Sequence, residues 1–310
     1  MVKAVFVGHV SVDKVRNLNG ERVQPGGAAL YAAMAAKSLG VEALLVTALG
    51  YDYPFKEVIY SNFPPQGIKL VEMPSTRFEI EYDDSWNAKY LKVEIGAGSK
   101  ITVSDVVKPA LLRSDAVHLA PMNPPKVLRM VEAIKRRAPG LKISINTCSH
   151  YLERNPRNRA CLLKAAELAD VTIVSDHELR LLTGVEAIAM AARKVKAKIL
   201  VVTLGELGAL IKEGDNVELT PALAGLVKNP VDTTGAGDVW CGAFLATYTA
   251  TGDLHKATSI ASILSAIKCL GWNFERISKL RFKEVDEVFE LATSFKEAHQ
   301  KLTKWLGGPA

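Results

Sequence analysis

Short apolar runs alternate with amphipathic stretches along most of the chain. Runs of the length and composition of strands buried on both faces lie at 2–8, 42–49, 116–119, 142–146, 171–174 and 198–203. Helical stretches that begin near Pro125, Pro156, Asp176 and Val185 separate the later runs. Alternating strands and helices require right-handed crossovers. The pattern therefore predicts an α/β fold with a doubly wound, mostly parallel sheet and helices on both faces.

Two other stretches follow a different pattern. Residues 76–82 and 89–95 alternate apolar and charged side chains, which is typical of strands with one dry and one wet face. Near the start, Asn19-Gly20 lies between two strand-like pieces of segment 13–24, and this dipeptide favours a hairpin turn. We predict that the hairpin and the two later strands form one small antiparallel sheet beside the main body.

The remaining pattern completes a single unit. A helix is expected at 27–39, closed by Gly40, and a second hairpin at 208–212 and 216–220. Apolar helices at 237–250 and 254–270 would cover the sheet, and a charged amphipathic helix at roughly 283–306 would close the chain. Because no internal repeat or low-complexity linker interrupts this order, one domain spanning 1–310 is predicted.

Composition excludes several classes of protein. The 310 residues contain no apolar run suited to crossing a membrane, and the first residues read as a strand, not a signal peptide. The four cysteines, Cys148, Cys161, Cys241 and Cys269, have no paired spacing, so we expect reduced thiols and a cytoplasmic location. The net charge of +6 is spread among acids without aromatic interleaving. No nucleic-acid or membrane partner is expected.

The most informative stretch is Asp232-Thr-Thr-Gly-Ala-Gly-Asp238, followed by an apolar helix. The start of a helix leaves backbone N–H groups unpaired, and small residues let an anion approach them. Asp238 nevertheless places a carboxylate in the first turn. Such a pairing suits phosphoryl transfer to an alcohol, in which an Asp orients the hydroxyl while backbone dipoles hold the phosphate. A plain helix-start role for Asp238 is the alternative.

This run resembles the C-terminal signature of the ribokinase family, also called the phosphofructokinase-B family, of sugar and nucleoside kinases. A second match, Pro25-Gly-Gly-Ala-Ala-Leu-Tyr31, resembles the substrate motif of that family, and the two matches together span nearly the whole chain. The resemblance implies one kinase domain over 1–310, an ATP-dependent transfer to a hydroxyl, and a β lid formed by segments 12–24 and 70–97. Asp238 would be the base, and Gly235, Ala236 and Gly237 would form the anion hole.

The resemblance also implies roles for residues elsewhere. Expected acceptor-binding residues, besides Asp238, are Ser11, Asp13, Gln24, Gly26, Gly27, Tyr31, Asn123 and Asn146. Expected nucleotide-binding residues are Ser175, Thr203, Gly205, Gly208 and Gly237. Glu178 would hold Mg²⁺, the ion that accompanies ATP, through water. Ser175 with Glu178 also has the spacing of a capping box. Asp232 and Thr234 would line a site for a monovalent cation such as K⁺.

The acceptor is predicted from departures within these motifs. Ala28, Tyr31 and Ala120 stand where ribokinase-like members carry polar groups for ribose, and no Arg lies near Cys148 to neutralise an acidic sugar. A neutral cyclic polyol or sugar is therefore expected, with myo-inositol as the main prediction, since the whole chain is similar to archaeal inositol kinases. Another sugar or a nucleoside is the alternative.

Two other classes of function fit the sequence less well. A dinucleotide oxidoreductase is disfavoured because the third glycine of its fingerprint would fall at Trp240. A non-catalytic sugar sensor on the same fold is disfavoured by the intact Asp238. The expected partners are a small polyol or sugar and a nucleotide, bound by a monomer or by a homodimer formed through the lid.

Overall fold

A computed structural model of the protein describes residues 1–153, 155–220, 227, 229–283, 285–288 and 290. Most of the helix predicted at 283–306 lies outside the described residues. Among the described residues, no helix has the length and apolar character needed to cross a membrane.

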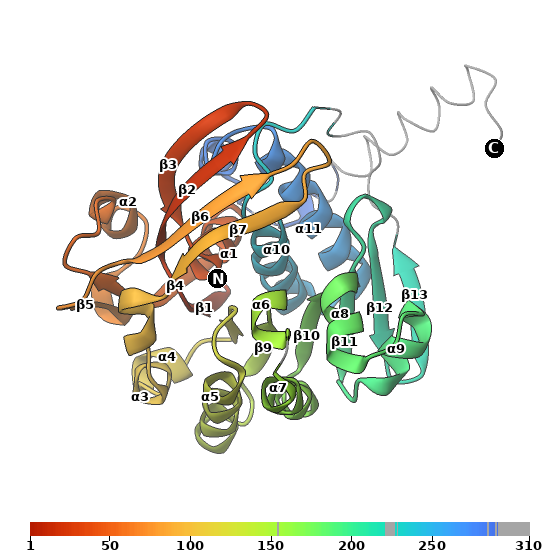
Figure 1. Ribbon diagram of the computed structural model, residues 1–310. Helices are drawn as coiled ribbons and strands as arrows, with labels where there is room; N and C mark the ends of the chain where they lie inside the picture. Colours follow the sequence, from red (N-terminus) through yellow and green to blue (C-terminus); the bar gives the residue numbers. More distant parts are fainter. Residues whose placement is uncertain (154, 221–226, 228, 284, 289, 291–310) are drawn as a thin grey trace.

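A nine-stranded sheet forms the centre of the molecule (Figure 1), in the order β13-β12-β11-β10-β9-β8-β1-β4-β5. The strands are β1 (Lys3–Val7), β4 (Glu42–Gly50), β5 (Ile68–Val71), β8 (Ala116–Leu119), β9 (Lys142–Asn146), β10 (Val171–Ser175), β11 (Ile199–Thr203), β12 (Ala209–Glu213) and β13 (Asn216–Thr220). From β11 to β5 every pairing is parallel, and β12 and β13 add an antiparallel edge. The predicted doubly wound α/β fold is confirmed.

The strand order reverses next to β1. The chain first builds outward from β1 to β4 and β5, then returns to place β8 on the other side of β1. The loops that leave the carboxyl ends of β1 and β8 therefore diverge, and a crevice opens between them. Open parallel sheets bind ligands at this kind of position.

Helices cover both faces of the sheet (Figure 1). One face carries α1 (Ala28–Ser38), α10 (Ala236–Thr251) and α11 (Leu254–Cys269), and their apolar side chains share one core. The other face carries α5 (Pro124–Arg137), α7 (Pro156–Leu168), α8 (Asp176–Thr183) and α9 (Ile188–Lys194) around a second core. Short helices and 3₁₀ turns complete the fold: α2 (Lys56–Tyr60), η1 (Pro65–Gly67), η2 (Gly96–Lys100), α3 (Val103–Val106), α4 (Pro109–Leu112), α6 (Ser149–Leu152), η3 (Gly205–Leu207) and η4 (Ile277–Lys279).

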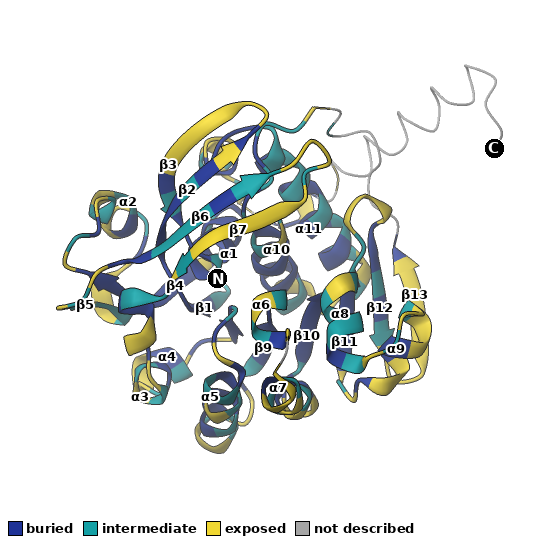
Figure 2. Ribbon diagram, in the orientation of Figure 1, coloured by how far each residue is buried: buried dark blue, intermediate teal, exposed yellow. Residues whose placement is uncertain are grey.

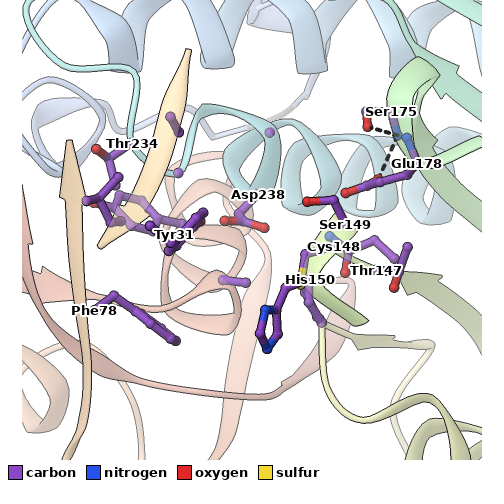
Figure 3. A pocket seen from close by; sticks show the side chains of 18 of the residues that line it. Tyr31, Phe78, Thr147, Cys148, Ser149, His150, Ser175, Glu178, Thr234 and Asp238 are labelled. Atoms are coloured by element: carbon purple, nitrogen blue, oxygen red, sulfur yellow. Dashed lines mark hydrogen bonds between the residues drawn. The ribbon is translucent and has the colours of Figure 1, made fainter. Parts of the chain in front are cut away.

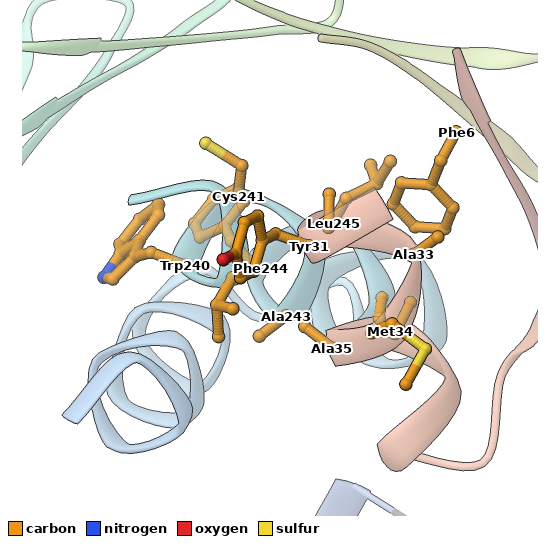
Figure 4. Packing of buried hydrophobic residues seen from close by; sticks show 14 of the residues in the cluster. Phe6, Tyr31, Ala33, Met34, Ala35, Trp240, Cys241, Ala243, Phe244 and Leu245 are labelled. Atoms are coloured by element: carbon orange, nitrogen blue, oxygen red, sulfur yellow. The ribbon is translucent and has the colours of Figure 1, made fainter. Parts of the chain in front are cut away.

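The contact between α1 and α10 is unusually close and fixes the start of α10 (Figure 4). A Cβ atom on Gly242 would lie 2.1 Å from the carbonyl oxygen of Ala32, so only glycine fits there. On the same helix, Phe244 stacks on Trp240 with ring centroids 5.1 Å apart. Because close-packed helices have little freedom to shift, the first turn of α10 is held in place against the sheet.

A second, four-stranded sheet in the order β3-β2-β6-β7 lies next to the large sheet (Figures 1 and 2). Its strands are β2 (Ser11–Asn17), β3 (Gly20–Gly26), β6 (Thr76–Tyr82) and β7 (Ala88–Glu94). The predicted hairpin 13–24 and the strands near 76–82 and 89–95 are thus confirmed. Leu70 and Val71, which we expected in the lid, belong to β5 of the large sheet.

The small sheet is not wholly antiparallel as predicted, because its central pair, β2 with β6, runs parallel. The two outer pairs are antiparallel. The cause is geometric. Strand β2 follows β1 and strand β6 follows β5, and β1 and β5 point the same way in the large sheet. The chain therefore leaves both strands at the same edge and in the same direction.

Candidate active site

A cavity of about 610 Å³ lies between the carboxyl edge of the large sheet and the underside of the small sheet. Its floor comes from the ends of β9, β10 and β11 and from the start of α10, and its roof comes from β6 and β7. The predicted residues Asp13, Gly27, Asn146, Thr203 and Asp238 all line it. Positions far apart in the sequence thus converge on one space.

The first turn of α10 forms the end of the cavity that suits an anion. Gly235, which precedes the helix, has φ +75°, and a Cβ atom there would lie 2.4 Å from Cδ2 of Tyr31. The N–H of Ala236 donates to the carbonyl of Thr233 at 3.1 Å. Helix geometry leaves the N–H groups of Gly237 and Asp238 without carbonyls one turn back. Open space at Gly237 lets an anion reach them.

Asp238 projects into the cavity between Tyr31 and the Cys148-Ser149 turn (Figure 3). It is half-buried because one side opens into the cavity, while protein surrounds the rest of the carboxyl group. Burial raises the pKa of Asp238 to about 7, and a hydrogen bond from Asn146 lowers it in part. A carboxyl group with this pKa can accept a proton near neutral pH.

Asp13 faces the same cavity from β2. Ser11 Oγ donates to Asp13 Oδ1 at 2.6 Å, which fixes the rotamer of the carboxyl group. Behind it, a Cβ atom on Gly26 would lie 1.8 Å from Asp13 Oδ2, so the missing side chain makes room for the carboxylate. Burial, reinforced by the charges of Asp238 and Asp232, raises the pKa of Asp13 to about 7. Ser11 and Gly26 therefore support Asp13 from behind and do not line the cavity.

Gly27, which follows Gly26, lines the cavity. Its φ is +101°, and a Cβ atom there would lie 2.2 Å from the carbonyl oxygen of His9. The backbone at Gly27 thus packs directly against the loop that follows β1. A ligand at this wall meets main chain and not a side chain.

Glu178 and Ser175 form the capping box that their spacing predicts (Figure 3). The N–H of Ser175 donates to Glu178 Oε2 at 2.8 Å, and the N–H of Glu178 donates to Ser175 Oγ at 3.2 Å. Burial raises the pKa of Glu178 to about 7. Within the described part of the chain, no three His, Cys, Asp or Glu side chains form a metal cage. Glu178 lines the cavity, and its carboxyl oxygens are of the kind that suits Mg²⁺ held through water.

Aromatic side chains that the sequence reading did not select form the roof. Phe78, Tyr82 and Tyr90 of the small sheet line the cavity, and so does His9 from the loop after β1. Phe78 and Tyr90 meet edge to face, with ring centroids 6.1 Å apart at 87°. The signal was present in the sequence, because the aromatic residues fall on the apolar positions of the two alternating strands.

Other predicted residues lie away from the cavity. Asn123 begins α5 and lines a separate surface depression with Lys126 and Arg129, so the structure does not bring it to the site. Gly205 and Gly208 lie in the turn after β11 and do not line the cavity, whereas Thr203 does. Asn123 lies beyond the end of β8 and directly precedes the two prolines that open α5. It is therefore positioned by α5 and not by the edge of the sheet.

Tyr31, which we expected to bind the acceptor, offers no open ring face. Its side chain is 1% exposed, with Gly235 against the ring and Phe274 at a centroid distance of 4.7 Å. Gln24 Nε2 donates to Tyr31 Oη at 3.3 Å. Tyr31 therefore supports the turn before α10, and Gln24, fully buried behind it, does not line the cavity.

The small sheet is tied to the turn before α10. Asn17 Nδ2 donates to the carbonyl of Val231 at 3.1 Å. Asn19 Nδ2 donates to the carbonyls of Pro230 and Val231, both at 3.0 Å. The tip of the β2–β3 hairpin thus contacts the residues that lead into the anion-binding turn.

Comparison with known proteins identifies the family. Residues 3–271 match the family described as pfkB family carbohydrate kinase. The chain belongs to the pfkB family. This family membership and the kinases among the relatives of the chain establish an ATP-dependent kinase with an alcohol group as acceptor. The resemblance read from residues 25–31 and 232–238 is confirmed at the level of the family.

Relatives of this pfkB kinase carry several acceptor names. It is 29% identical to a cytidine kinase of Thermococcus kodakarensis over 84% of this chain and 93% of that one. It is 27% identical to a fructokinase of Vibrio alginolyticus (77% and 81% covered) and 25% identical to a nucleoside kinase of Methanothermobacter thermautotrophicus (83% and 80% covered).

Solved structures agree on the fold. A nucleoside kinase of Burkholderia thailandensis in complex with inosine superposes with a TM-score of 0.76 at 20% identity, covering 94% of this chain and 99% of that one. A fructokinase variant of Vibrio cholerae O395, bound to fructose, ADP and a potassium ion, gives 0.74 at 20% identity, covering 95% and 98%. These matches show the ribokinase-like fold, whereas the acceptor of the present chain is a separate matter.

Proposed function

We propose that this pfkB kinase phosphorylates a hydroxyl of the ribosyl group of a nucleoside. The observation that carries the proposal is that the aromatic side chains of Phe78, Tyr82 and Tyr90 line the same cavity as Asp13 and Asp238. Phe78 is the register partner of Asp13 in the small sheet. A nucleoside has a planar base and a sugar with adjacent hydroxyls. It matches a site that offers aromatic rings for the base and carboxylates for the hydroxyls.

The aromatic rings of the roof favour a base over a plain sugar. Stacking of a base on an aromatic side chain contributes about 1–3 kcal/mol. Myo-inositol has no π face, and its hydroxyls would lose water against the ring faces, where only the hydroxyls of Tyr82 and Tyr90 offer partners. The 29% identity with a cytidine kinase supports the nucleoside, which was the alternative to our main prediction from the sequence.

The carboxylates of the cavity account for the phosphoryl transfer. Asp13 would accept hydrogen bonds from ribosyl hydroxyls, and Asp238 would accept the proton of the hydroxyl that attacks. As the new bond to the γ-phosphorus forms, the bond to the bridging oxygen of ADP breaks. The N–H groups of Gly237 and Asp238 would hold the transferred phosphoryl group. Mg²⁺ bound with ATP neutralises phosphate charge, and Glu178 would orient its water ligands.

Myo-inositol is the second candidate, favoured by one observation. Ala28 lines the cavity with a methyl group, and Ala120 lies fully buried beside the loop after β1. Neither residue offers a polar atom to ribose, as the sequence had indicated. A neutral polyol held by Asp13 alone would tolerate both.

An acceptor panel tests the proposal. Cytidine, inosine, adenosine, ribose, fructose and myo-inositol would be compared by kcat/KM with Mg²⁺ and ATP. We expect the best nucleoside to exceed ribose and myo-inositol by at least about tenfold, because a stacked base contributes about 1–3 kcal/mol. If myo-inositol surpasses every nucleoside, the second candidate is correct and the first is wrong.

A variant in the roof sharpens this test. Phe78→Ala should lower kcat/KM for the nucleoside by about tenfold or more and leave the value for ribose within about twofold. Leu91→Ala is the matched control, since Leu91 lies on β7 of the same sheet, is 51% exposed and does not line the cavity. Equal losses for the nucleoside and for ribose in Phe78→Ala would contradict a base-stacking role.

A further inference from the structure

The carboxyl group of Asp232 already has a cationic partner within the protein. Lys268 Nζ donates to Asp232 Oδ2 at 3.0 Å and to the backbone carbonyl of Asp232 at 2.5 Å. Both side chains are 0% exposed. This place is where the sequence reading expected Asp232 and Thr234 to hold a monovalent cation.

Hydrogen-bond donors reach both carboxylate oxygens of Asp232. The N–H of Thr234 donates to Oδ1 at 2.9 Å, and the N–H of Asn273 donates to Oδ2 at 3.2 Å. Burial favours a higher pKa for Asp232, but the charge of Lys268 and these hydrogen bonds outweigh it and hold the pKa below its usual range. The residues do not fit an additional K⁺ at this carboxylate, because the ammonium group occupies the approach to it.

Lys268 is placed to organise the phosphate-binding turn. It lies in the last turn of α11, whereas Asp232 begins the stretch that ends at Gly237. Its ammonium group joins α11 to this stretch, and its Nζ lies 5.8 Å from the centroid of the Tyr31 ring, which packs under Gly235. A second link from α11 to this stretch is the hydrogen bond from Ser265 Oγ to the carbonyl of Ala236, at 2.9 Å.

We propose that the ammonium group of Lys268 is a built-in monovalent cation that orders the turn from Asp232 to Gly237, so that this kinase requires no K⁺. A free K⁺ must be captured from solution and desolvated. A lysine on a packed helix is always present and already positioned, which makes the order of the turn independent of salt composition. Lys268 thus acts as a positioning residue for phosphoryl transfer and does not touch the reacting atoms.

Cation dependence of the wild-type kinase is the first test. Turnover would be compared in KCl, NaCl and choline chloride at one ionic strength, and we expect the rates to agree within about twofold, since general screening is then equal. Strong activation by K⁺ would overturn the proposal. The test rests only on kinase activity, and any acceptor that the panel identifies will serve.

Removal of the ammonium group is the second test. Lys268→Ala should lose about 10²-fold in kcat in choline chloride, because a turn misplaced by about 1 Å costs that much. K⁺ or NH₄⁺, which fit the space vacated, should restore activity, whereas Lys268→Met should gain nothing because its side chain fills that space. Lys256→Ala is the matched control on the same helix, where Lys256 pairs with Asp286. It should remain active and insensitive to K⁺.

A readout without turnover accompanies these rates. Since a cation that binds only the folded protein raises its melting temperature, K⁺ should raise the melting temperature of Lys268→Ala above its value in choline, but not that of the wild type. A folded Lys268→Ala that is fully active in choline, or inactive in every cation, contradicts the proposal. If Lys268→Ala does not fold, the wild-type comparison decides.

Discussion

Gly26 and Asp13 occupy a space that only one side chain can fill. A Cβ atom on Gly26 would lie 1.8 Å from Asp13 Oδ2 and 2.2 Å from Asp13 Cγ. In the register of β2 and β3, Gly26 pairs with Ser11 and Asp13 pairs with Gln24, so Gly26 and Asp13 are diagonal neighbours. Because the hydrogen bond from Ser11 Oγ holds the carboxyl group from one side, the carboxyl group has little room to turn away.

We therefore expect Gly26→Ala to displace the carboxyl group of Asp13 and to impair acceptor binding. The loss in kcat/KM should be on the order of 10²-fold, with most of it in KM for the acceptor and little change in KM for ATP. Gly140→Ala is the control, because a Cβ atom there meets nothing within 4 Å. Unchanged acceptor kinetics in a folded Gly26→Ala would remove Asp13 from the acceptor site.

Asp238→Asn tests the proposed base. The amide keeps the shape of the side chain, so the melting temperature and the affinity for ATP should be nearly unchanged. Turnover should fall by about 10²–10⁴-fold, the contribution of a positioned general base. Asp215→Asn, in the exposed turn between β12 and β13, controls for the loss of a negative charge. A rate near that of the wild type in Asp238→Asn would require another proton acceptor.

The dependence of activity and stability on pH should run in opposite directions. Burial raises the pKa values of Asp13, Glu178 and Asp238 to about 7. A base must be ionised, so kcat/KM should rise with pH through an apparent pKa near 7 that belongs to the coupled carboxyl groups. An ionisation near pH 7 covers a range of about pH 5.5 to 8. If kcat/KM of the wild type stays constant over this range, the assignment of a base with this pKa is wrong.

Stability follows from the same shifts by linkage. Between about pH 4 and pH 7 these three carboxyl groups hold more protons in the folded protein without ligands than in the unfolded chain, since unfolded Asp and Glu titrate near 4. The buried His9 and His118, whose pKa values burial lowers to about 4, oppose this below about pH 6.5 but are fewer. The free energy of unfolding should therefore fall as pH rises through this window. Urea unfolding at several pH values measures the slope, and Asp238→Asn should reduce it. Equal slopes for the wild type and Asp238→Asn would show that the carboxyl group of Asp238 is not buried as described.

Hydrogen exchange tests the small sheet as a lid. Residues 13–24 and 76–95 should exchange more slowly when an acceptor is bound, because closure over a ligand excludes water. The strands of the large sheet, such as β9, serve as the internal reference and should not change. Equal exchange of the small sheet with and without acceptor would mean that it does not close.

The main fold was predictable because its strands are marked by continuous apolar runs. Strands β8 and β9 have the predicted bounds, 116–119 and 142–146. Strand β5 was not predicted, because its half-buried edge position leaves neither an apolar run nor a clean alternation. The parallel pairing of β2 with β6 was also out of reach, since it depends on where β1 and β5 stand in the large sheet.

The site was predictable where a residue type carries its own chemistry. Asp13, Asp238 and Glu178 belong to recognisable motifs, and all three reach the cavity. Lys268 was not predicted, because a lysine within a helix reads as a surface residue until the fold brings it to Asp232, 36 residues earlier. Tyr31 was placed correctly beside the site, but sequence could not show that Phe274 and Gly235 would cover its ring.

The hydrogen bonds from Asn17 and Asn19 to Pro230 and Val231 make the two halves of the cavity interdependent. An acceptor that draws the β2–β3 hairpin inward also restrains the carbonyls just ahead of the phosphate turn. A nucleotide that fixes this turn likewise restrains the hairpin. Since linkage is reciprocal, each substrate should raise the affinity for the other by the same factor, although the two make no use of a common side chain at this joint. We therefore expect a substrate synergy that depends on Asn17 and Asn19.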